Sequence, residues 1–232
     1  MTEPSLETTR RLLDYVDASP TPFHAVSESI RQLEAAGFTR LAEEDRWSLS
    51  AGDKHYVARN GSTLIAFVVG SEAPADGGYR LVGAHTDSPN LRLKPQPGYT
   101  KEGYLQLGLE VYGGVLLAPW LDRDLSIAGR VVVAGEDAPR MLRIDRPLCR
   151  IANVAIHLNR EVNKKGLLVN KQKHLPPLIG LSGDKKDKTW FQSFLAKELG
   201  IDSATEVLGF DLMLFDLVPS CISGLNEEFI HA

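Results

Sequence analysis

The segment Gly83-Ala84-His85-Thr86-Asp87-Ser88-Pro89 contains the residues best suited to chemistry. It follows a short apolar run, residues 79–84, that we predict to be a strand buried on both faces, of the kind found in α/β sheets. The carboxyl ends of such strands are where these sheets place their ligand sites. Histidine and aspartate two positions apart on an extended backbone point to the same side. The His85 imidazole can then bind a metal ion, while the Asp87 carboxylate acts on its orientation and basicity.

A zinc ion held by such an imidazole lowers the pKa of its bound water and polarises a carbonyl group, which is what peptide hydrolysis needs. The His-x-Asp triplet by itself also occurs by chance, and a purely structural role for both side chains is the alternative.

A longer sequence pattern favours the interpretation of His85 as a metal ligand. Residues 81–95 resemble the first metal-binding motif of the aspartyl aminopeptidase family of zinc metallopeptidases. Other blocks resemble the same family in the same order along the chain. They are residues 18–25, 111–114, 120–125, 155–160 and 224–230.

This resemblance implies roles for three residues and a site with two zinc ions. His85 corresponds to a zinc ligand, and Asp87 to the aspartate that supports the metal site and is described as catalytic. His157 corresponds to a second functional histidine, which is either associated with zinc or reaches the active site of a neighbouring subunit. In the second case its imidazole would stabilise the oxyanion of a tetrahedral intermediate.

The family's remaining ligands have no counterpart among the 232 residues. They are a bridging aspartate, a Glu-Glu pair with the general base, another carboxylate and a late histidine. Glu227 and Glu228 match a different block, so we interpret them as structural, and His231 matches no ligand position. We therefore expect the N-terminal part of an aminopeptidase, either a fragment or one of two polypeptides, that is inactive or nearly so by itself.

The resemblance also implies an α/β fold class, with a discontinuous catalytic domain and an inserted β-rich dimerisation domain. We predict that residues 1–89 form the first piece of the catalytic domain, 90–219 the insert, and 220–232 the returning segment. A change in sequence pattern after Pro89 supports this division, because alternating strand-like segments dominate the middle of the chain.

Local patterns predict the individual elements. The predicted helices are one with apolar residues between 6 and 16, one capped by Ser19 or Thr21 and stopped at Gly37, and one over 190–199 ended by Gly200. The predicted strands are 54–59 and 62–69 around an Asn60-Gly61 turn, 105–112, 126–133 paired with 140–144, and 205–217. The lysine-rich runs at 164–173 and 185–188 are predicted to be solvated loops.

Composition limits the partners. The chain has 26 basic and 30 acidic side chains, a net charge of −4, which argues against a sequence-independent nucleic-acid binder. Its apolar runs contain glycine and proline and are too short to span a membrane, and no signal peptide is visible, so we expect a cytoplasmic protein. Two cysteines cannot form a disulfide framework or a four-thiolate zinc site. The glycines form neither a P-loop nor a dinucleotide fingerprint.

The leading hypothesis is a zinc-dependent aminopeptidase that removes single residues from the N-termini of peptides and forms a homo-oligomer through the inserted domain. The preferred N-terminal residue stays open between acidic (Asp or Glu) and neutral or apolar. Arg92, Lys94 and Arg123 are candidates by charge for a cationic pocket that binds an acidic side chain, although ion pairs are the simpler interpretation. The alternative hypothesis is a noncatalytic assembly module, since more than half of the chain is the predicted insert.

Overall fold

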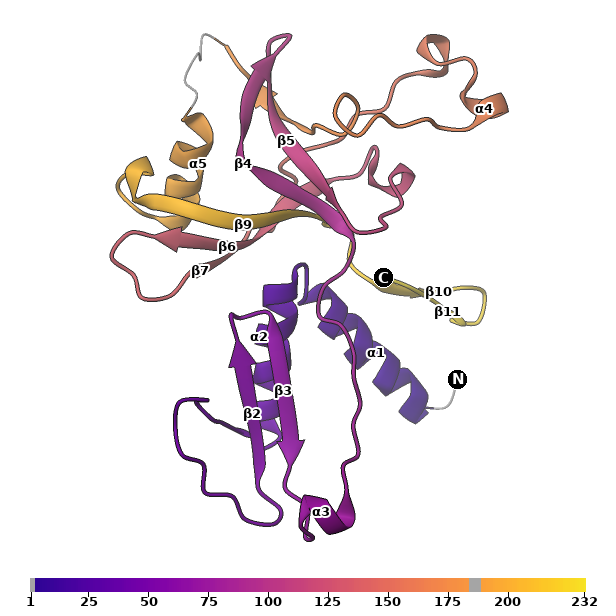
Figure 1. Ribbon diagram of the computed structural model, residues 1–232. Helices are drawn as coiled ribbons and strands as arrows, with labels where there is room; N and C mark the ends of the chain where they lie inside the picture. Colours follow the sequence, from indigo (N-terminus) through magenta and orange to yellow (C-terminus); the bar gives the residue numbers. More distant parts are fainter. Residues whose placement is uncertain (1–2, 184–188) are drawn as a thin grey trace. The chain divides into compact units, whose positions relative to one another are not determined.

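The computed structural model describes residues 3–183 and 189–232 (Figure 1). The chain divides into two compact units. The first unit consists of residues 1–88 together with 220–232, and the second of residues 89–219. The first unit is thus built from two stretches that are far apart in the sequence, and the second from one continuous stretch.

Two helices begin the first unit, α1 (Glu3–Asp17) and α2 (Pro22–Ala35). Thr21 is the N-cap of α2, where its hydroxyl accepts from the His24 backbone amide, and Pro22 occupies the first turn. Gly37 follows the end of α2 with a φ of +84°. The predicted start and stop of this helix are therefore confirmed.

The first unit also contains a three-stranded sheet in the order β1-β2-β3. Its strands are β1 (Thr39–Arg40), β2 (Lys54–Arg59) and β3 (Thr63–Val68), with β1 parallel and β3 antiparallel to β2. Asn60 and Gly61 connect β2 to β3 with φ values of +51° and +64°, as the predicted hairpin turn requires. A short helix, α3 (Pro74–Gly77), follows β3.

Residues 220–232 complete the first unit as a small hairpin of β10 (Cys221–Ser223) and β11 (Phe229–His231). The Asp17 carboxylate at the end of α1 accepts hydrogen bonds from the backbone amide and the hydroxyl of Ser220, at 2.8 and 2.6 Å. These bonds join the two stretches of the unit.

The prediction of a buried strand at residues 79–84 is wrong. These residues form neither strand nor helix and run as an extended coil between α3 and β4 (Figure 1). Leu81 and Val82 are 88% and 101% exposed. A strand buried on both faces needs hydrogen-bonded neighbours and a covering layer on each side, and the described chain provides neither around these residues.

The second unit is built on a six-stranded antiparallel sheet in the order β7-β6-β9-β4-β5-β8. Its strands are β4 (Asn90–Lys101), β5 (Tyr104–Tyr112), β6 (Leu125–Val133), β7 (Arg140–Arg143), β8 (Leu178–Leu181) and β9 (Val207–Asp216). The predicted pairing of β6 with β7 and the alternation along β5 are confirmed, since Leu105, Leu107 and Leu109 are buried. The predicted alternation along β9 is only partly correct, because residues 212–215 are buried on both faces of that strand.

One long helix and several short ones accompany this sheet. The long one, α5 (Trp190–Leu199), ends as predicted at Gly200, whose φ of +65° is left-handed. The short ones are η1 (Ala118–Trp120), η2 (Ile156–Leu158), α4 (Val162–Lys165) and η3 (Ala204–Glu206). The first lysine run thus begins in the short helix α4 rather than in a loop, and the run at 185–188 lies outside the described residues.

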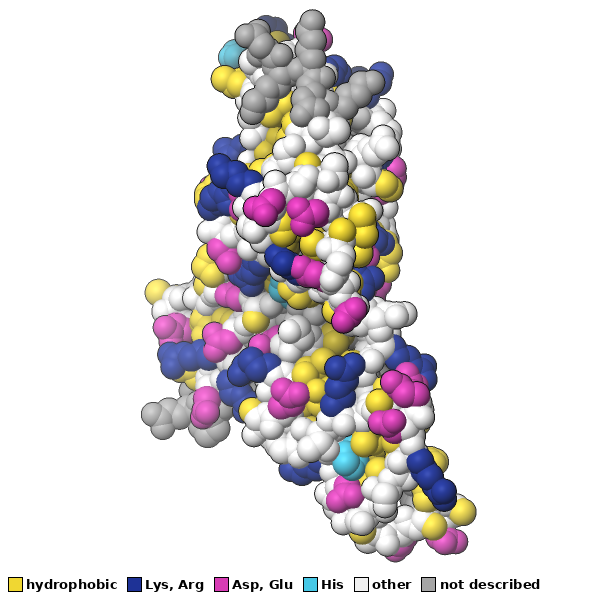
Figure 2. All heavy atoms as spheres, turned by 90° about the vertical axis from the view of Figure 1, so that its left-hand side faces the viewer, with side chains coloured by type: hydrophobic (Ala, Val, Ile, Leu, Met, Phe, Trp, Pro, Cys, Tyr) yellow, Lys and Arg dark blue, Asp and Glu magenta, His cyan; other side chains and the backbone are white. Residues whose placement is uncertain are grey.

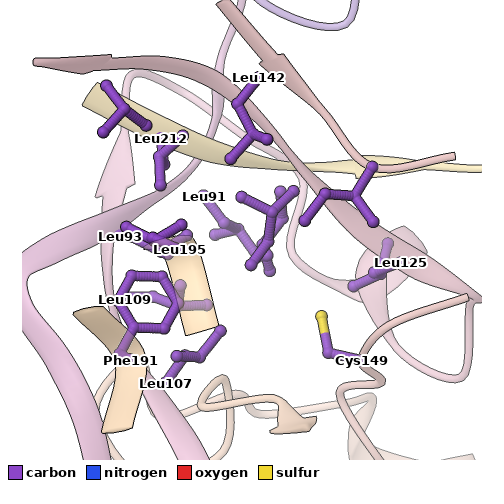
Figure 3. Packing of buried hydrophobic residues seen from close by; sticks show 14 of the residues in the cluster. Leu91, Leu93, Leu107, Leu109, Leu125, Leu142, Cys149, Phe191, Leu195 and Leu212 are labelled. Atoms are coloured by element: carbon purple, nitrogen blue, oxygen red, sulfur yellow. The ribbon is translucent and has the colours of Figure 1, made fainter. Parts of the chain in front are cut away.

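The core of the second unit lies between α5 and the sheet. Leucines from β4, β5, β6, β7 and β9 point toward one another and toward Phe191 and Leu195 of α5 (Figure 3). The Phe191 ring, fully buried, contacts the rings of Trp190, Phe194 and Phe210 at centroid distances of 5.6 to 5.9 Å. Burial of Cys149 beside this core raises the pKa of its thiol to about 12, so the thiol stays protonated and is a packing group rather than a nucleophile.

On the face shown in Figure 2, basic and acidic side chains are interspersed. Several of the surface charges form ion pairs, such as Arg146 with Glu198 at 2.6 Å. No helix within residues 3–183 and 189–232 combines the length and apolar character that crossing a bilayer requires.

A substitution at Gly129 tests how closely β6 packs against β9. It lies in β6 with a φ of +148°, and a Cβ added there would be 2.1 Å from the Asp211 carbonyl oxygen of β9. We predict that Gly129→Ala lowers the free energy of unfolding of the second unit by at least about 2 kcal/mol, measured by urea denaturation. Gly209→Ala is the matched control, because Gly209 lies in the neighbouring β9 and its Cβ would meet open space. Equal stability of the two variants would contradict this packing.

Candidate functional site

His85 is an exposed member of the predicted site. Its side chain is 79% exposed, at the end of the extended coil that follows α3. The ring lies outside the apolar core of the first unit, so it is open to a ligand approaching from solvent.

A hydrogen bond with the backbone, rather than with the Asp87 carboxylate, orients the His85 ring. Its Nδ1 lies 2.5 Å from the Asp87 carbonyl oxygen and 3.8 Å from the nearer Asp87 carboxylate oxygen. Because a carbonyl oxygen only accepts, Nδ1 must carry the proton in this contact. In the neutral ring the lone pair is then on Nε2, which is the state of a histidine that binds a metal ion through Nε2.

Thr86 anchors this segment to the sheet of the first unit. Its hydroxyl donates to the Ser62 carbonyl oxygen at 2.7 Å, in the turn between β2 and β3. This bond fixes the position of the backbone between His85 and Asp87 relative to the turn between β2 and β3. The Asp87 side chain is 47% exposed, which leaves its carboxylate accessible.

The donor set fits part of a zinc site. His85 supplies an imidazole nitrogen and Asp87 a carboxylate, both of which are ordinary zinc ligands. Within the described residues, however, no three His, Cys, Asp or Glu side chains come together to hold a metal ion. A protein zinc site normally uses three or four such ligands, so the described residues do not complete one.

His157 belongs to the other unit. It lies in η2 of the second unit, and His85 and Asp87 lie in the first. The His157 side chain is exposed, and so are its neighbours Ile156 and Leu158, at 44% and 79%. The structure therefore brings His85 and Asp87 together in one segment and places His157 on an exposed turn with apolar neighbours.

The three cations considered for binding an acidic substrate side chain are all in ion pairs. Arg92 pairs with Asp211, Arg123 with Asp216, and Lys94 with Glu110 at 3.1 Å. Arg92 and Lys94 also line a hollow of about 670 Å³ over the sheet of the second unit. The simpler interpretation of these residues as ion-pair partners is confirmed.

Glu228 is engaged within its own turn. Hydrogen bonds from the backbone amide of Asn226, at 2.9 Å, and from its side-chain amide, at 2.8 Å, lower the pKa of the Glu228 carboxyl. The preceding Glu227 has a φ of +58° in the same turn. The structural interpretation of the Glu-Glu pair agrees with these contacts.

The sequence patterns did not predict the bonds that hold separate segments of the first unit together or the bond that orients His85. The Thr86–Ser62 bond spans 24 positions and the Asp17–Ser220 bonds span 203. Threonine, serine and aspartate are common surface residues, so no local pattern marks these pairs. The Asp87 carbonyl was missed for a different reason, because every residue carries one.

Comparison with known proteins gives a consistent result. Residues 15–232 match the family model described as "Aminopeptidase I zinc metalloprotease (M18)". A "Probable M18 family aminopeptidase 2" from Azotobacter vinelandii is 46% identical over 230 residues, 97% of this chain and 53% of the relative. The chain thus spans about half the length of the curated relatives it matches.

Two solved structures are similar in fold. One is a chain of the cryo-EM structure of the Ape4 and Nbr1 complex, with a TM-score of 0.88 and 36% identity, over 96% of this chain and 46% of that one. The other is the S. cerevisiae mApe1 dodecamer, with a TM-score of 0.74 and 28% identity, over 96% of this chain and 51% of that one. Both likenesses support a mixed α/β fold.

The family match covers nearly the whole chain, and the relative's identity is well above the level at which family membership is in question. These matches identify the family. The chain belongs to the M18 family of aminopeptidase I zinc metalloproteases.

Proposed function

We propose that this chain supplies the first metal motif of an M18 aminopeptidase, an enzyme that removes single residues from the N-termini of peptides with zinc at its active site. The observation that carries the proposal is the His85 ring, whose Nδ1 contact with the Asp87 carbonyl leaves Nε2 free in a solvent-accessible position. In the complete enzyme the metal ions would supply activation of water and polarisation of the peptide carbonyl. The role of His85 in this chain is to bind and to stay oriented, and the role of Asp87 is to place negative charge beside it.

The two units have different proposed roles. Residues 1–88 and 220–232 are the part of the catalytic domain that carries His85, and residues 89–219 are the inserted dimerisation domain. The β-rich sheet of the second unit, with its own core around Phe191, supports its being an independent domain. We propose that the remaining metal ligands, and a complete two-zinc site, come from polypeptide outside this chain, so the chain alone is inactive or nearly so.

His157 is proposed to act in a neighbouring subunit. Its exposed position between Ile156 and Leu158 supports this role, because two apolar side chains on a turn are favourable when another chain covers them. The dodecameric state of the S. cerevisiae relative supports assembly as a homo-oligomer. We propose that His157 donates a hydrogen bond to the oxyanion that forms in the partner's site.

The preferred N-terminal residue of the substrate is left open. Arg92, Lys94 and Arg123 are each neutralised by a carboxylate, so they give no support to an acidic specificity. A noncatalytic assembly module is the second candidate, favoured by the incomplete metal-ligand set of the described residues.

A chimera tests the proposal against this alternative. In the chimera this chain replaces the matching part of the Azotobacter vinelandii relative, which is 46% identical to it. We predict zinc-dependent release of the N-terminal residue from aminoacyl p-nitroanilides by the chimera, and no such release by the 232-residue chain alone. A chimera that folds and assembles but has no aminopeptidase activity would favour the assembly module.

His85→Ala in the chimera tests the metal ligand. The change removes the Nε2 lone pair, so we predict a loss of bound zinc and a fall in kcat/KM of more than about 100-fold. His174→Ala is the control, since His174 is an exposed histidine of the second unit whose ring accepts a hydrogen bond from the Asn170 backbone amide. Zinc is measured by elemental analysis. Full zinc content and full activity in His85→Ala would contradict the assignment.

The variant Asp87→Asn distinguishes the contribution of the Asp87 carboxylate from that of the Asp87 backbone carbonyl. The asparagine keeps the carbonyl that accepts from His85 Nδ1 but loses the negative charge. We predict that zinc content is largely retained while kcat falls about 10- to 100-fold. Loss of zinc equal to that in His85→Ala would show that the carboxylate, and not the backbone bond, maintains the ligand.

His157→Phe tests the proposed contribution to a neighbouring subunit. Phenylalanine keeps the apolar character of the turn but cannot donate a hydrogen bond, so we predict a fall in kcat of at least about 100-fold with zinc content unchanged. Light scattering measures the oligomeric state in parallel. Unchanged kinetics and oligomer size would remove His157 from the site.

A further inference from the structure

A hollow of about 670 Å³ lies over the sheet of the second unit. Its lining residues come from β4, β5, β6, β9 and the loop before β7, and all of them belong to this unit. Sites for small molecules are typically about 300–1,000 Å³ in volume. The hollow is therefore large enough to hold a ligand.

The charged side chains of the hollow lie on the face of the sheet opposite to the leucine core. Arg92 stands between Leu91 and Leu93, which are buried in that core. Arg130 likewise precedes the buried Val131. Because successive side chains of a strand point to opposite faces, both arginines point away from the core. Their side chains are 38% and 30% exposed, so a ligand in solution reaches them.

Four charged residues of alternating sign form a row across neighbouring strands. Arg130 of β6 is opposite Asp211 of β9. Arg92 of β4 is opposite Glu110 of β5, and an ion pair between Arg92 and Asp211 connects the two halves of the row. Lys94, which pairs with Glu110 at 3.1 Å, also lines the hollow. The lining therefore has one more positive charge than its two carboxylates neutralise.

The cations of the lining also have more hydrogen-bond donors than these carboxylates can accept. A guanidinium has five N–H donors, and a lysine ammonium has three. The Asp211 carboxylate is shared by both arginines, and its distance of 3.9 Å from Arg130 Nη2 is too long for a hydrogen bond. An anion in the hollow can therefore accept charge-assisted hydrogen bonds from Arg92 and Arg130 while the ion pairs persist.

Apolar surface makes up most of the walls of the hollow. The Arg92 guanidinium lies 5.7 Å from the centroid of the Tyr112 ring, which is part of the lining. Val132, which is 40% exposed, lines the hollow together with Pro139 and Phe210. A few convergent polar groups within mostly apolar walls are typical of small-molecule sites.

We propose that this hollow binds a carboxylate that carries an apolar group, supplied by a small organic acid or by the C-terminus of a peptide. The carboxylate accepts from Arg92 and Arg130, and the apolar group covers Val132. A single negative charge matches the one positive charge in excess, whereas a doubly charged phosphate would be repelled by Asp211 and Glu110. The inference is independent of the proposed function, because it uses no residue assigned there to metal binding or catalysis.

Binding to the 232-residue chain is measured with 4-phenylbutyrate, which combines one carboxylate with an apolar ring. The matched probe is 4-phenylbutyramide, which has a similar shape without the charge. We predict saturable binding of the acid with a Kd of about 1 mM, and at least about 10-fold weaker binding of the amide. Isothermal titration calorimetry measures the affinities, and NMR shifts of the backbone amides locate the ligand at β4, β6 and β9.

Two substitutions locate the contact. Arg130→Gln removes one positive charge but keeps a hydrogen-bond donor, and Val132→Glu adds a negative charge to the wall. We predict that each weakens binding of 4-phenylbutyrate at least about 5-fold. The matched controls, with unchanged affinity expected, are Arg146→Gln and Leu181→Glu. Both are exposed positions of the second unit that do not line the hollow. Circular dichroism compares the fold of the four variants.

Two peptides identify the source of the carboxylate. Acetyl-Gly-Gly-Phe has a free C-terminus and a blocked N-terminus that an aminopeptidase cannot cleave, and its C-terminal amide is the control. Tighter binding of this peptide than of 4-phenylbutyrate, lost in the amide, would assign the hollow to a peptide C-terminus. Equal or weaker binding would assign it to a small organic acid.

Several outcomes would overturn the inference. Equal affinity for 4-phenylbutyrate and its amide would show that the hollow recognises only apolar groups. Absence of saturable binding at about 10 mM, amide shifts confined to other strands, or unchanged affinity in Arg130→Gln or Val132→Glu would also contradict it. Tighter binding of inorganic phosphate than of 4-phenylbutyrate would show that the ligand is a phosphate and not a carboxylate.

Discussion

The hydrogen bond from His85 Nδ1 to the Asp87 carbonyl is the constraint on which the site depends. It commits one ring nitrogen to the protein and leaves the other available for a ligand. The bond uses the backbone, so it does not depend on whether the Asp87 carboxylate is charged. In the proposed function the carboxylate would act on the metal through its charge, so the backbone and the side chain of Asp87 would have separate functions.

A metal-ligating side chain can act only where further ligands reach the same ion. In this chain both the segment that leads into His85 and the set of metal ligands lack partners within the described residues. The residues leading into His85 have no strand partners, and the described residues provide no complete metal-ligand set. Backbone groups and apolar side chains at 79–84 gain most when neighbouring strands cover them.

The second unit differs from the first because it has an extensive apolar core of its own. Its core joins five strands and α5 around Phe191, and its buried residues include most of the leucines of β4, β5 and β6. The exposed turn that carries His157 belongs to this unit. Under the proposed function, the second unit would be the assembly unit and the first unit would carry part of the catalytic site.

How much the sequence predicts depends on whether the signal is local. The Asn60-Gly61 turn, the Thr21 cap and the Gly200 stop depend on residues within a few positions, and all three are predicted correctly. The pattern around His85 finds the candidate site because its residues are consecutive. Burial of 79–84 is predicted wrongly because an apolar run reveals a need for partners and not their presence. The Thr86–Ser62 bond lies beyond prediction because it joins two common residues from separate segments.

The state of the His85 ring is the most direct test of the account. The six histidines can be labelled with ¹⁵N, and the His85 signals identified by their loss in His85→Ala. Nitrogen chemical shifts at about pH 8, where ordinary imidazoles are neutral, then report which ring nitrogen carries the proton. The account predicts a protonated Nδ1 and an unprotonated Nε2 in the 232-residue chain. A proton on Nε2, with Nδ1 free, would contradict it.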